Sequence, residues 1–321
     1  MFVAGEPSRP RLLVLVGPTA VGKTRLSLTL AQQYNAEIIS GDSMQVYRGM
    51  DIGTAKASSE ELSLVKHHLI DIHDPNEPFS VAEFQERSVP LIHDLNEQGK
   101  LPFIVGGTGL YIESVCYDFQ FSETGSDEPF REEMQRIADL QGNEVLHERL
   151  RTVDPGSADR LHPNDVRRVI RALEIYHMTG ERMSEQLQRQ NRTTPYRLCI
   201  VGLTMDRAIL YKRIEERIDL MLEQGLVGEV GRLLEQGVDP SALSMQGLGY
   251  KEIVAHLEGR LTLAEATDLL KKNTRHFAKR QLSWFRHMKD IDWVDMSEMG
   301  DFSTQLRAVH GIIATKLNLD R

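Results

Sequence analysis

The strongest constraint on the fold is a short segment near the start of the chain, where a phosphate-binding motif joins a strand-like run to a helix-like run. Residues 12–16 are all apolar, which is typical of a strand buried on both faces of a parallel sheet. From Thr24 onward, apolar residues recur with helical spacing. Between the two runs lies the motif G-x-x-x-x-G-K-T, formed by Gly17, Gly22, Lys23 and Thr24. Such a unit predicts an α/β protein built around a parallel sheet.

This motif predicts a binding site for phosphate groups. Its glycines let the backbone wrap closely around phosphate oxygens, and the N-terminus of the following helix adds positive potential. Lys23 adds a full charge, and the Thr24 hydroxyl is suited to bind Mg²⁺. The expected phosphate loop consists of Gly17, Pro18, Thr19, Ala20, Val21, Gly22, Lys23 and Thr24. Kinases, switch proteins and transferases all use such loops, so the loop alone does not define the reaction.

Further strand and helix patterns extend this unit into a doubly wound sheet. Residues 36–40 and 101–105 predict buried strands, and residues 68–72 predict another. In the sequence, one helix is expected before the strand at 101–105 and another after it. Ligands of open parallel sheets bind where the strands end, so Asp42 is expected beside the phosphate loop.

The alternation of strands and helices stops between residues 120 and 195, where only helical patterns occur. The expected helices lie at 130–140, 143–152, 155–161, 165–179 and 182–190. Residues 198–203 then restore a buried strand, and a late edge strand is expected at 291–296. We therefore predict that residues 1–119 and 196–321 form a phosphate-loop core, and that residues 120–195 form an all-helical insertion.

Composition indicates where a protein of this kind acts. No apolar run approaches the ~20 residues of a membrane span, and residues 1–10 lack the apolar centre of a signal peptide. Two cysteines, Cys116 and Cys199, lie far apart and beside apolar residues. This pattern favours buried thiols in a reducing compartment over a disulfide or a zinc site. We expect a cytoplasmic monomer with no membrane partner.

Charge is unevenly distributed along the chain. The net charge of −9 argues at first against a nucleic-acid partner. However, residues 271–289 contain seven Lys or Arg and no acid, and a second basic cluster is formed by Arg160, Arg167, Arg168 and Arg171. Local patches of this kind are the expected footprint of a nucleic acid.

Several stretches in this sequence resemble the bacterial tRNA dimethylallyltransferases, also called isopentenyl-tRNA transferases. The phosphate loop is shared with many families, whereas the segments that contain Asp42 and Trp284 are more specific. Together the matching stretches span nearly the whole chain: residues 17–24, 39–56, 67–72, 106–111, 162–174, 247–252 and 279–286.

The resemblance implies transfer of a dimethylallyl group from dimethylallyl diphosphate to the exocyclic amine of the adenosine immediately 3′ of the anticodon. The phosphate loop would then hold the donor's diphosphate rather than ATP, with Mg²⁺ on Thr24 and a guanidinium from Arg213 or, by analogy, Arg217. An adenine amine is a poor nucleophile that needs a nearby base, and Asp42 suits that task. The catalytic set implied is Asp42, Lys23, Thr24 and Arg217.

The resemblance also implies residues that contact the anticodon stem-loop of tRNA. The target base must leave its stack to reach a buried donor. Its pocket would be lined by Asp42, Ser43, Met44, Gln45 and Thr108. The RNA would be gripped by Val166, Arg167, Arg168, Val169, Ile170, Lys279, Arg280 and Arg286, with Arg131 matching by a weaker motif.

Simpler interpretations exist for the same residues. Asp42 can be a helix N-cap, and the arginines near Arg167 can be a solvated helix face paired with Glu174. Trp284 and Phe285 fit a core better than a base-stacking platform. His67 and His68 are adjacent in a predicted strand and point to opposite faces, which disfavours a shared metal.

Other functions also remain open at this level. A small-molecule kinase fits the same sheet and predicts ATP turnover, but leaves the basic segment at 271–289 unexplained. A GTPase switch is disfavoured, because the chain has no Asn-Lys-x-Asp motif. A non-catalytic RNA-binding protein explains the basic patches but gives the phosphate loop and Asp42 no purpose.

Overall fold

The computed structural model describes residues 9–121, 125–190, 192–297 and 300–319. The chain forms two compact units. The core unit comprises Met1–Tyr117 and Thr194–Arg321, and the helical unit comprises Asp118–Thr193. No helix among the described residues combines the length and apolar character needed to cross a bilayer.

The core unit is built on a parallel sheet with strand order β3-β2-β4-β1-β5-β6. The strands are β1 (Arg11–Val16), β2 (Ala36–Gly41), β3 (His67–His68), β4 (Leu101–Gly106), β5 (Arg197–Thr204) and β6 (Ile291–Asp295). The central strands β1, β2 and β4 are almost wholly buried, as the apolar runs in the sequence predict. The predicted α/β fold is therefore confirmed, including the late edge strand.

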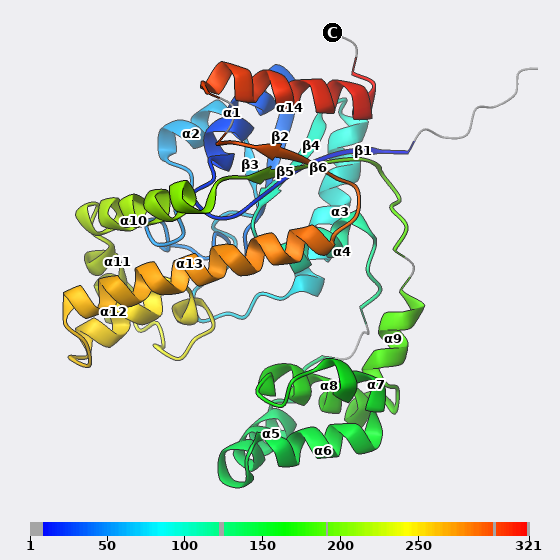
Figure 1. Ribbon diagram of the computed structural model, residues 1–321, viewed down its shortest axis with the longest axis vertical. Coiled ribbons are helices and arrows are strands. Elements are labelled where there is room, and N and C mark those ends of the chain that lie inside the picture. Colours follow the sequence, from blue (N-terminus) through cyan, green and yellow to red (C-terminus); the bar gives the residue numbers. More distant parts are fainter. Residues whose placement is uncertain (1–8, 122–124, 191, 298–299, 320–321) are drawn as a thin grey trace, which may run out of the picture. The chain divides into compact units, whose positions relative to one another are not determined.

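Helices cover both faces of this sheet (Figure 1). From β1 the chain moves along the sheet to β2, and then returns to β4. Right-handed crossovers therefore place the two connecting helices, α1 (Lys23–Gln33) and α3 (Val81–Glu97), on opposite faces. The C-terminal helix α14 (Phe302–Leu317) packs beside α1, and α4 (Gly109–Cys116) packs beside α3.

A set of helices connects β5 to β6. Its longest member, α13 (Leu263–His287), runs for 25 residues and begins at a capping box of Thr262 and Glu265. The set consists of α10 (Arg207–Glu223), α11 (Leu226–Glu235), the short 3₁₀ helix η1 (Ser244–Gln246), α12 (Tyr250–Leu257) and α13 (Leu263–His287). The helix α2 (Ser59–Leu64) precedes β3.

The helical unit has a core of its own. Leu146, Leu150 and Val169 are fully buried there, at helical spacings that the sequence already displays. Its helices lie where the sequence predicts them: α5 (Glu128–Gln141), α6 (Asn143–Val153), α7 (Pro155–Arg160), α8 (Val166–Thr179) and α9 (Met183–Arg189).

Candidate active site

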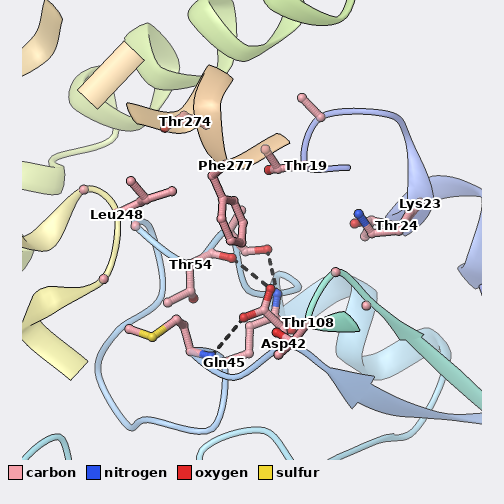
Figure 2. Close-up of a pocket in the computed structure, with 18 of the residues that line it drawn as sticks. Thr19, Lys23, Thr24, Asp42, Gln45, Thr54, Thr108, Leu248, Thr274 and Phe277 are labelled. Carbon is pink, nitrogen blue, oxygen red and sulfur yellow. Dashed lines mark hydrogen bonds between the residues drawn. The ribbon is translucent and has the colours of Figure 1, made fainter. Parts of the chain in front are cut away.

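A cavity of about 680 Å³ opens at the C-terminal ends of β1, β2 and β4. It is lined by parts of the phosphate loop, by the turn that follows β2, and by side chains of α10 and α13. Figure 2 shows Lys23 and Thr24 on one side, and Asp42, Gln45 and Thr108 together on another. The parallel sheet thus brings together segments that are far apart in the sequence.

The lysine of the phosphate loop forms hydrogen bonds with the backbone of the same loop. Lys23 Nζ donates hydrogen bonds of 2.9 Å to the carbonyl oxygens of Gly17 and Pro18. Gly22 precedes α1 with φ at 108°, in a region that disfavours residues with a Cβ. Burial and, to a smaller extent, the charge of Arg217 together lower the pKa of Lys23 to about 7, and the charge of Asp42 opposes both effects.

Asp42 closes the turn that follows β2. Its Oδ1 accepts a hydrogen bond of 2.9 Å from the backbone N–H of Met44. No helix begins here, since residues 42–50 form turns and bends with an isolated bridge at Tyr47, so the helix N-cap interpretation is wrong. Burial raises the pKa of Asp42, while the Met44 N–H and the charges of Lys23 and Arg217 oppose the rise. The result is a desolvated carboxyl group in contact with the cavity.

Arg217, rather than Arg213, lies in the cavity. Its guanidinium is 3.4 Å from Thr19 Oγ1 in the phosphate loop. Burial lowers the pKa of Arg217, and the charge of Asp42 opposes the shift. Arg213, one helical turn earlier on α10, has an exposed side chain and is not among the cavity-lining residues.

The predicted base pocket is assembled around Thr108. Its Oγ1 accepts a hydrogen bond of 3.1 Å from the backbone N–H of Ser43. Ser43, Met44, Gln45 and Thr108 all line the cavity next to Asp42. The two segments meet because β2 and β4 are neighbours in the sheet.

Gln281 on α13 is a site residue that sequence reasoning missed. Its Oε1 accepts a 3.0 Å hydrogen bond from Thr19 N, and its Nε2 donates one of 3.0 Å to Gly107 O. The side chain therefore ties the phosphate loop to the turn after β4. It lies in the 279–286 stretch that resembles the transferase family, but no spacing rule singles it out.

Some of the cationic side chains predicted to contact RNA are solvent-exposed. Lys279, Arg280 and Arg286 are exposed on α13, and Arg280 also lines the cavity. In the helical unit, Arg167 and Arg168 are exposed on α8.

Two of the predicted arginines of the helical unit are paired with acids. Arg168 forms a 2.8 Å ion pair with Asp165. Arg131 pairs with Glu128 and, at 2.8 Å, with Glu174. The simpler interpretation, in which Glu174 pairs with the α8 arginines, holds for Arg171 at 2.6 Å.

Two of the predicted RNA contacts need correction. Val169 and Ile170 are 0% and 6% exposed and belong to the core of the helical unit. Their side chains are therefore unavailable to RNA, because the apolar stripe of α8 packs inward. Val166 is partly buried against the same core.

The histidine pair has two different hydrogen-bond partners, and the aromatic pair differs in burial. His68 Nε2 lies 2.6 Å from Glu37 Oε2, and His67 Nδ1 lies 2.8 Å from Val65 O. Phe285 is fully buried, as expected, whereas Trp284 is 37% exposed, so the core prediction is wrong for the indole. Cys116 and Cys199 are buried free thiols, as predicted.

Thr24 fits a magnesium ion that is shared with a phosphate ligand. Its exposed side chain lines the cavity at the start of α1. The described residues contain no cluster of three or more His, Cys, Asp or Glu suited to a metal ion. Mg²⁺ in phosphate sites needs few protein ligands, since phosphate oxygens and water complete its coordination.

Comparisons of the sequence identify close relatives of this chain. A family model described as IPP transferase matches residues 45–288. A tRNA dimethylallyltransferase of Bacillus mycoides (strain KBAB4) is 52% identical over 314 residues, which cover 98% of this chain and 99% of the relative.

Solved structures are also similar to this chain. A full-length tRNA isopentenylpyrophosphate transferase from Bacillus halodurans aligns with a TM-score of 0.73 and 48% identity, over 96% of this chain and 97% of that one. A eukaryotic dimethylallyltransferase, described as acting on tRNA, aligns with a TM-score of 0.82 and 30% identity, over 96% of this chain and 79% of that one.

Proposed function

Because the chain belongs to the IPP transferase family, we propose that it is a tRNA dimethylallyltransferase. It transfers a dimethylallyl group from dimethylallyl diphosphate to the N6 amine of the adenosine immediately 3′ of the anticodon, in the cytoplasm. The observation that carries this proposal is the convergence of a phosphate loop and a partly buried carboxyl group, Asp42, on one cavity.

The phosphate loop, Lys23 and Arg217 bind the diphosphate of the donor. Lys23 donates to two backbone carbonyls of the loop, and its charge is disfavoured by burial and by Arg217. A bound diphosphate compensates both cations. The same groups stabilise the negative charge that develops when diphosphate leaves. Mg²⁺ held by Thr24 would neutralise part of that charge.

Asp42 acts as the general base for the adenine amine. The N6 lone pair forms a bond to the allylic carbon of the donor, the bond from that carbon to the diphosphate oxygen breaks, and the N6 proton passes to the carboxylate of Asp42. Burial makes this carboxylate more basic than a solvated aspartate, which favours proton transfer near neutral pH.

The target adenine enters the cavity as a base that has flipped out of the anticodon loop. A base stacked in an anticodon loop cannot reach Asp42 without leaving its stack. Ser43, Gln45 and Thr108 offer polar groups to its edge. The exposed cations of α13 and α8 bind the phosphate backbone of the RNA.

The test is mass analysis of tRNA nucleosides after incubation with the protein, Mg²⁺ and dimethylallyl diphosphate. One adenosine should gain the mass of a dimethylallyl group less one hydrogen, and the modified residue should map immediately 3′ of the anticodon. Unmodified tRNA, with the donor intact, would refute the proposal. A parallel incubation with ATP in place of the donor is the control.

A further inference from the structure

One wall of the cavity is a loop that follows the predicted base pocket. Gly53, Thr54 and Ala55 line the cavity from this loop. The loop lies between β2 and α2, and residues 51–55 form no strand or helix of their own. Hydrogen bonds within the loop, such as Ala55 N to Ile52 O, are joined by contacts with other parts of the chain.

The main anchor of this loop is a buried carboxylate on α11. Glu229 is 3% exposed, and its Oε2 accepts hydrogen bonds of 3.1 Å from Asp51 N and 2.8 Å from Ile52 N. Its Oε1 accepts 3.1 Å from Gly53 N and 2.7 Å from the hydroxyl of Tyr250. Four donors thus converge on one carboxylate, which satisfies its buried charge.

Tyr250, the first residue of α12, completes the anchor. It is 1% exposed, and burial together with Glu229 holds the pKa of its hydroxyl well above the ordinary value. A Cβ at Gly53 would lie 2.6 Å from the Tyr250 ring, so only glycine fits there. The loop is held by hydrogen bonds from Glu229 and by the face of this ring.

The anchored loop in turn holds the base pocket. Gln45 Nε2 donates hydrogen bonds of 3.3 Å to Thr54 O and 3.5 Å to Ala55 O (Figure 2). Gln45 Oε1 accepts 2.9 Å from the hydroxyl of Ser40. The side chain of Gln45, three residues after Asp42, is therefore fixed between β2 and the loop.

We propose that Glu229 is a positioning residue for the adenine side of the active site. It fixes the backbone of residues 51–53, and through the carbonyls of Thr54 and Ala55 it fixes Gln45 beside Asp42. The inference rests on the proposed function and extends it to a residue that does not line the cavity. The phosphate loop is held separately, by Gln281.

The test is the variant Glu229→Gln. The amide replaces one acceptor oxygen by a donor group, so at least one backbone N–H of the loop loses its partner. The single-turnover rate of transfer, with tRNA and donor saturating, should fall about tenfold to a hundredfold, the order of loss caused by a small misplacement of reacting groups. The dissociation constant for dimethylallyl diphosphate should stay within about twofold of the wild-type value.

A second variant keeps the test informative if Glu229→Gln fails to fold. Tyr250→Phe preserves the ring against Gly53 but removes one of the four donors, so the same rate should fall by a few-fold. Glu235→Gln, at an exposed position on the same helix, is the matched control and should retain the wild-type rate.

The outcomes separate this inference from the proposed function. A purely structural role for Glu229 would reduce donor binding and transfer in parallel, in proportion to the folded fraction, and would overturn the inference. Wild-type rates in both variants would overturn it too, while leaving the proposed function intact. A wild-type protein that transfers no dimethylallyl group would refute both.

Discussion

Asp42 lies at a point where burial and charge act against each other. Burial raises the pKa of its carboxyl group, and the cations Lys23 and Arg217 oppose that rise. Burial and the charge of Arg217 lower the pKa of Lys23 to about 7, while the charge of Asp42 opposes that fall. An anion bound beside Lys23 and Arg217 would favour the charged form of the lysine, which fits a diphosphate donor.

Replacement of Asp42 by Asn tests its role as the base. The amide keeps the shape and an acceptor oxygen but cannot take up the proton, so the single-turnover transfer rate should fall by roughly 10²–10⁴-fold. The wild-type rate should fall as the pH is lowered through a pKa above the ordinary ~3.9 of aspartate, because only the carboxylate is a base. Asp268→Asn, exposed on α13, is the control. A rate within a few-fold of wild type would remove Asp42 from this role.

Replacement of Lys23 or Thr24 by Ala tests the donor side. Each change removes part of the diphosphate cradle, so donor affinity and transfer rate should fall while tRNA affinity survives. Donor affinity of the wild type should also weaken as the pH rises through about 7, because the neutral lysine must take up a proton to pair with the anion. Lys23→Ala should lose that component of the pH dependence. Equal losses of tRNA and donor affinity would contradict this division.

At the scale of elements, α8 has one buried face and one exposed face. Val169 and Ile170 face the core of the helical unit, whereas Arg167 and Arg168 are exposed. The sequence displays this amphipathic pattern, but the resemblance to a family assigns the whole segment to RNA. Only burial distinguishes the two groups, and burial depends on which helices pack against α8.

Charge reversal at Arg167 together with Arg168 should weaken tRNA binding. Each lost phosphate contact reduces the slope of log affinity against log salt by about 0.7–0.9. The matched control is the same reversal at Arg136 and Arg149, which are exposed on α5 and α6 of the same unit. An unchanged slope in a folded variant would assign Arg167 and Arg168 to a solvated face.

Glu174 is the main electrostatic constraint on the helical unit. It is fully buried, pairs with Arg131 and Arg171, and accepts a 2.8 Å hydrogen bond from Asp127 N. Glu174→Gln should destabilise the unit by roughly 2–4 kcal/mol, less than for a fully buried pair because both arginines are about a third exposed. Denaturant unfolding of the variant checks this value.

The pH dependence gives a second test of Glu174. These contacts outweigh the desolvation and lower the pKa of its carboxyl group, so the stabilisation is fully present above the unfolded pKa near ~4.3. It should be lost as the pH falls through the lower, folded pKa. Glu174→Gln should lack that acid-dependent loss, and an identical acid transition in both proteins would contradict the assignment.

For the whole molecule, the sequence predicts local elements well and long-range contacts poorly. The strand predicted at 68–72 is wrong in its bounds, since only His67 and His68 form β3, and Leu69 and Asp71 have positive φ values. The sequence predicts C-terminal helices in the core but does not place one at α14 (Phe302–Leu317). Asp42 is detectable because it follows a strand, whereas Glu229 and Gln281 act across more than 170 residues. No local pattern encodes such partners.

Ligand protection of the whole protein distinguishes the two phosphate-loop functions. Dimethylallyl diphosphate with Mg²⁺, at a hundred times its dissociation constant, should stabilise the folded state by about 2.7 kcal/mol and raise the unfolding temperature. ATP at the same concentration should give a smaller shift. Thermal unfolding with each ligand makes the comparison, and stronger protection by ATP would favour a kinase.

The strand order has a consequence for synthesis of the chain on the ribosome. The first strand, β1, is central in the sheet and pairs with β4 and with β5, which ends only at Thr204. At typical translation speeds of 5–20 residues per second, the nascent β1 waits on the order of 10–40 s for its second neighbour. The whole helical unit, residues 118–193, is synthesised during that interval. Its helices pack against one another, so they do not wait for later segments. The strand that is encoded first, which leads into the phosphate loop, thus gains its second neighbour only after the helical unit has been synthesised.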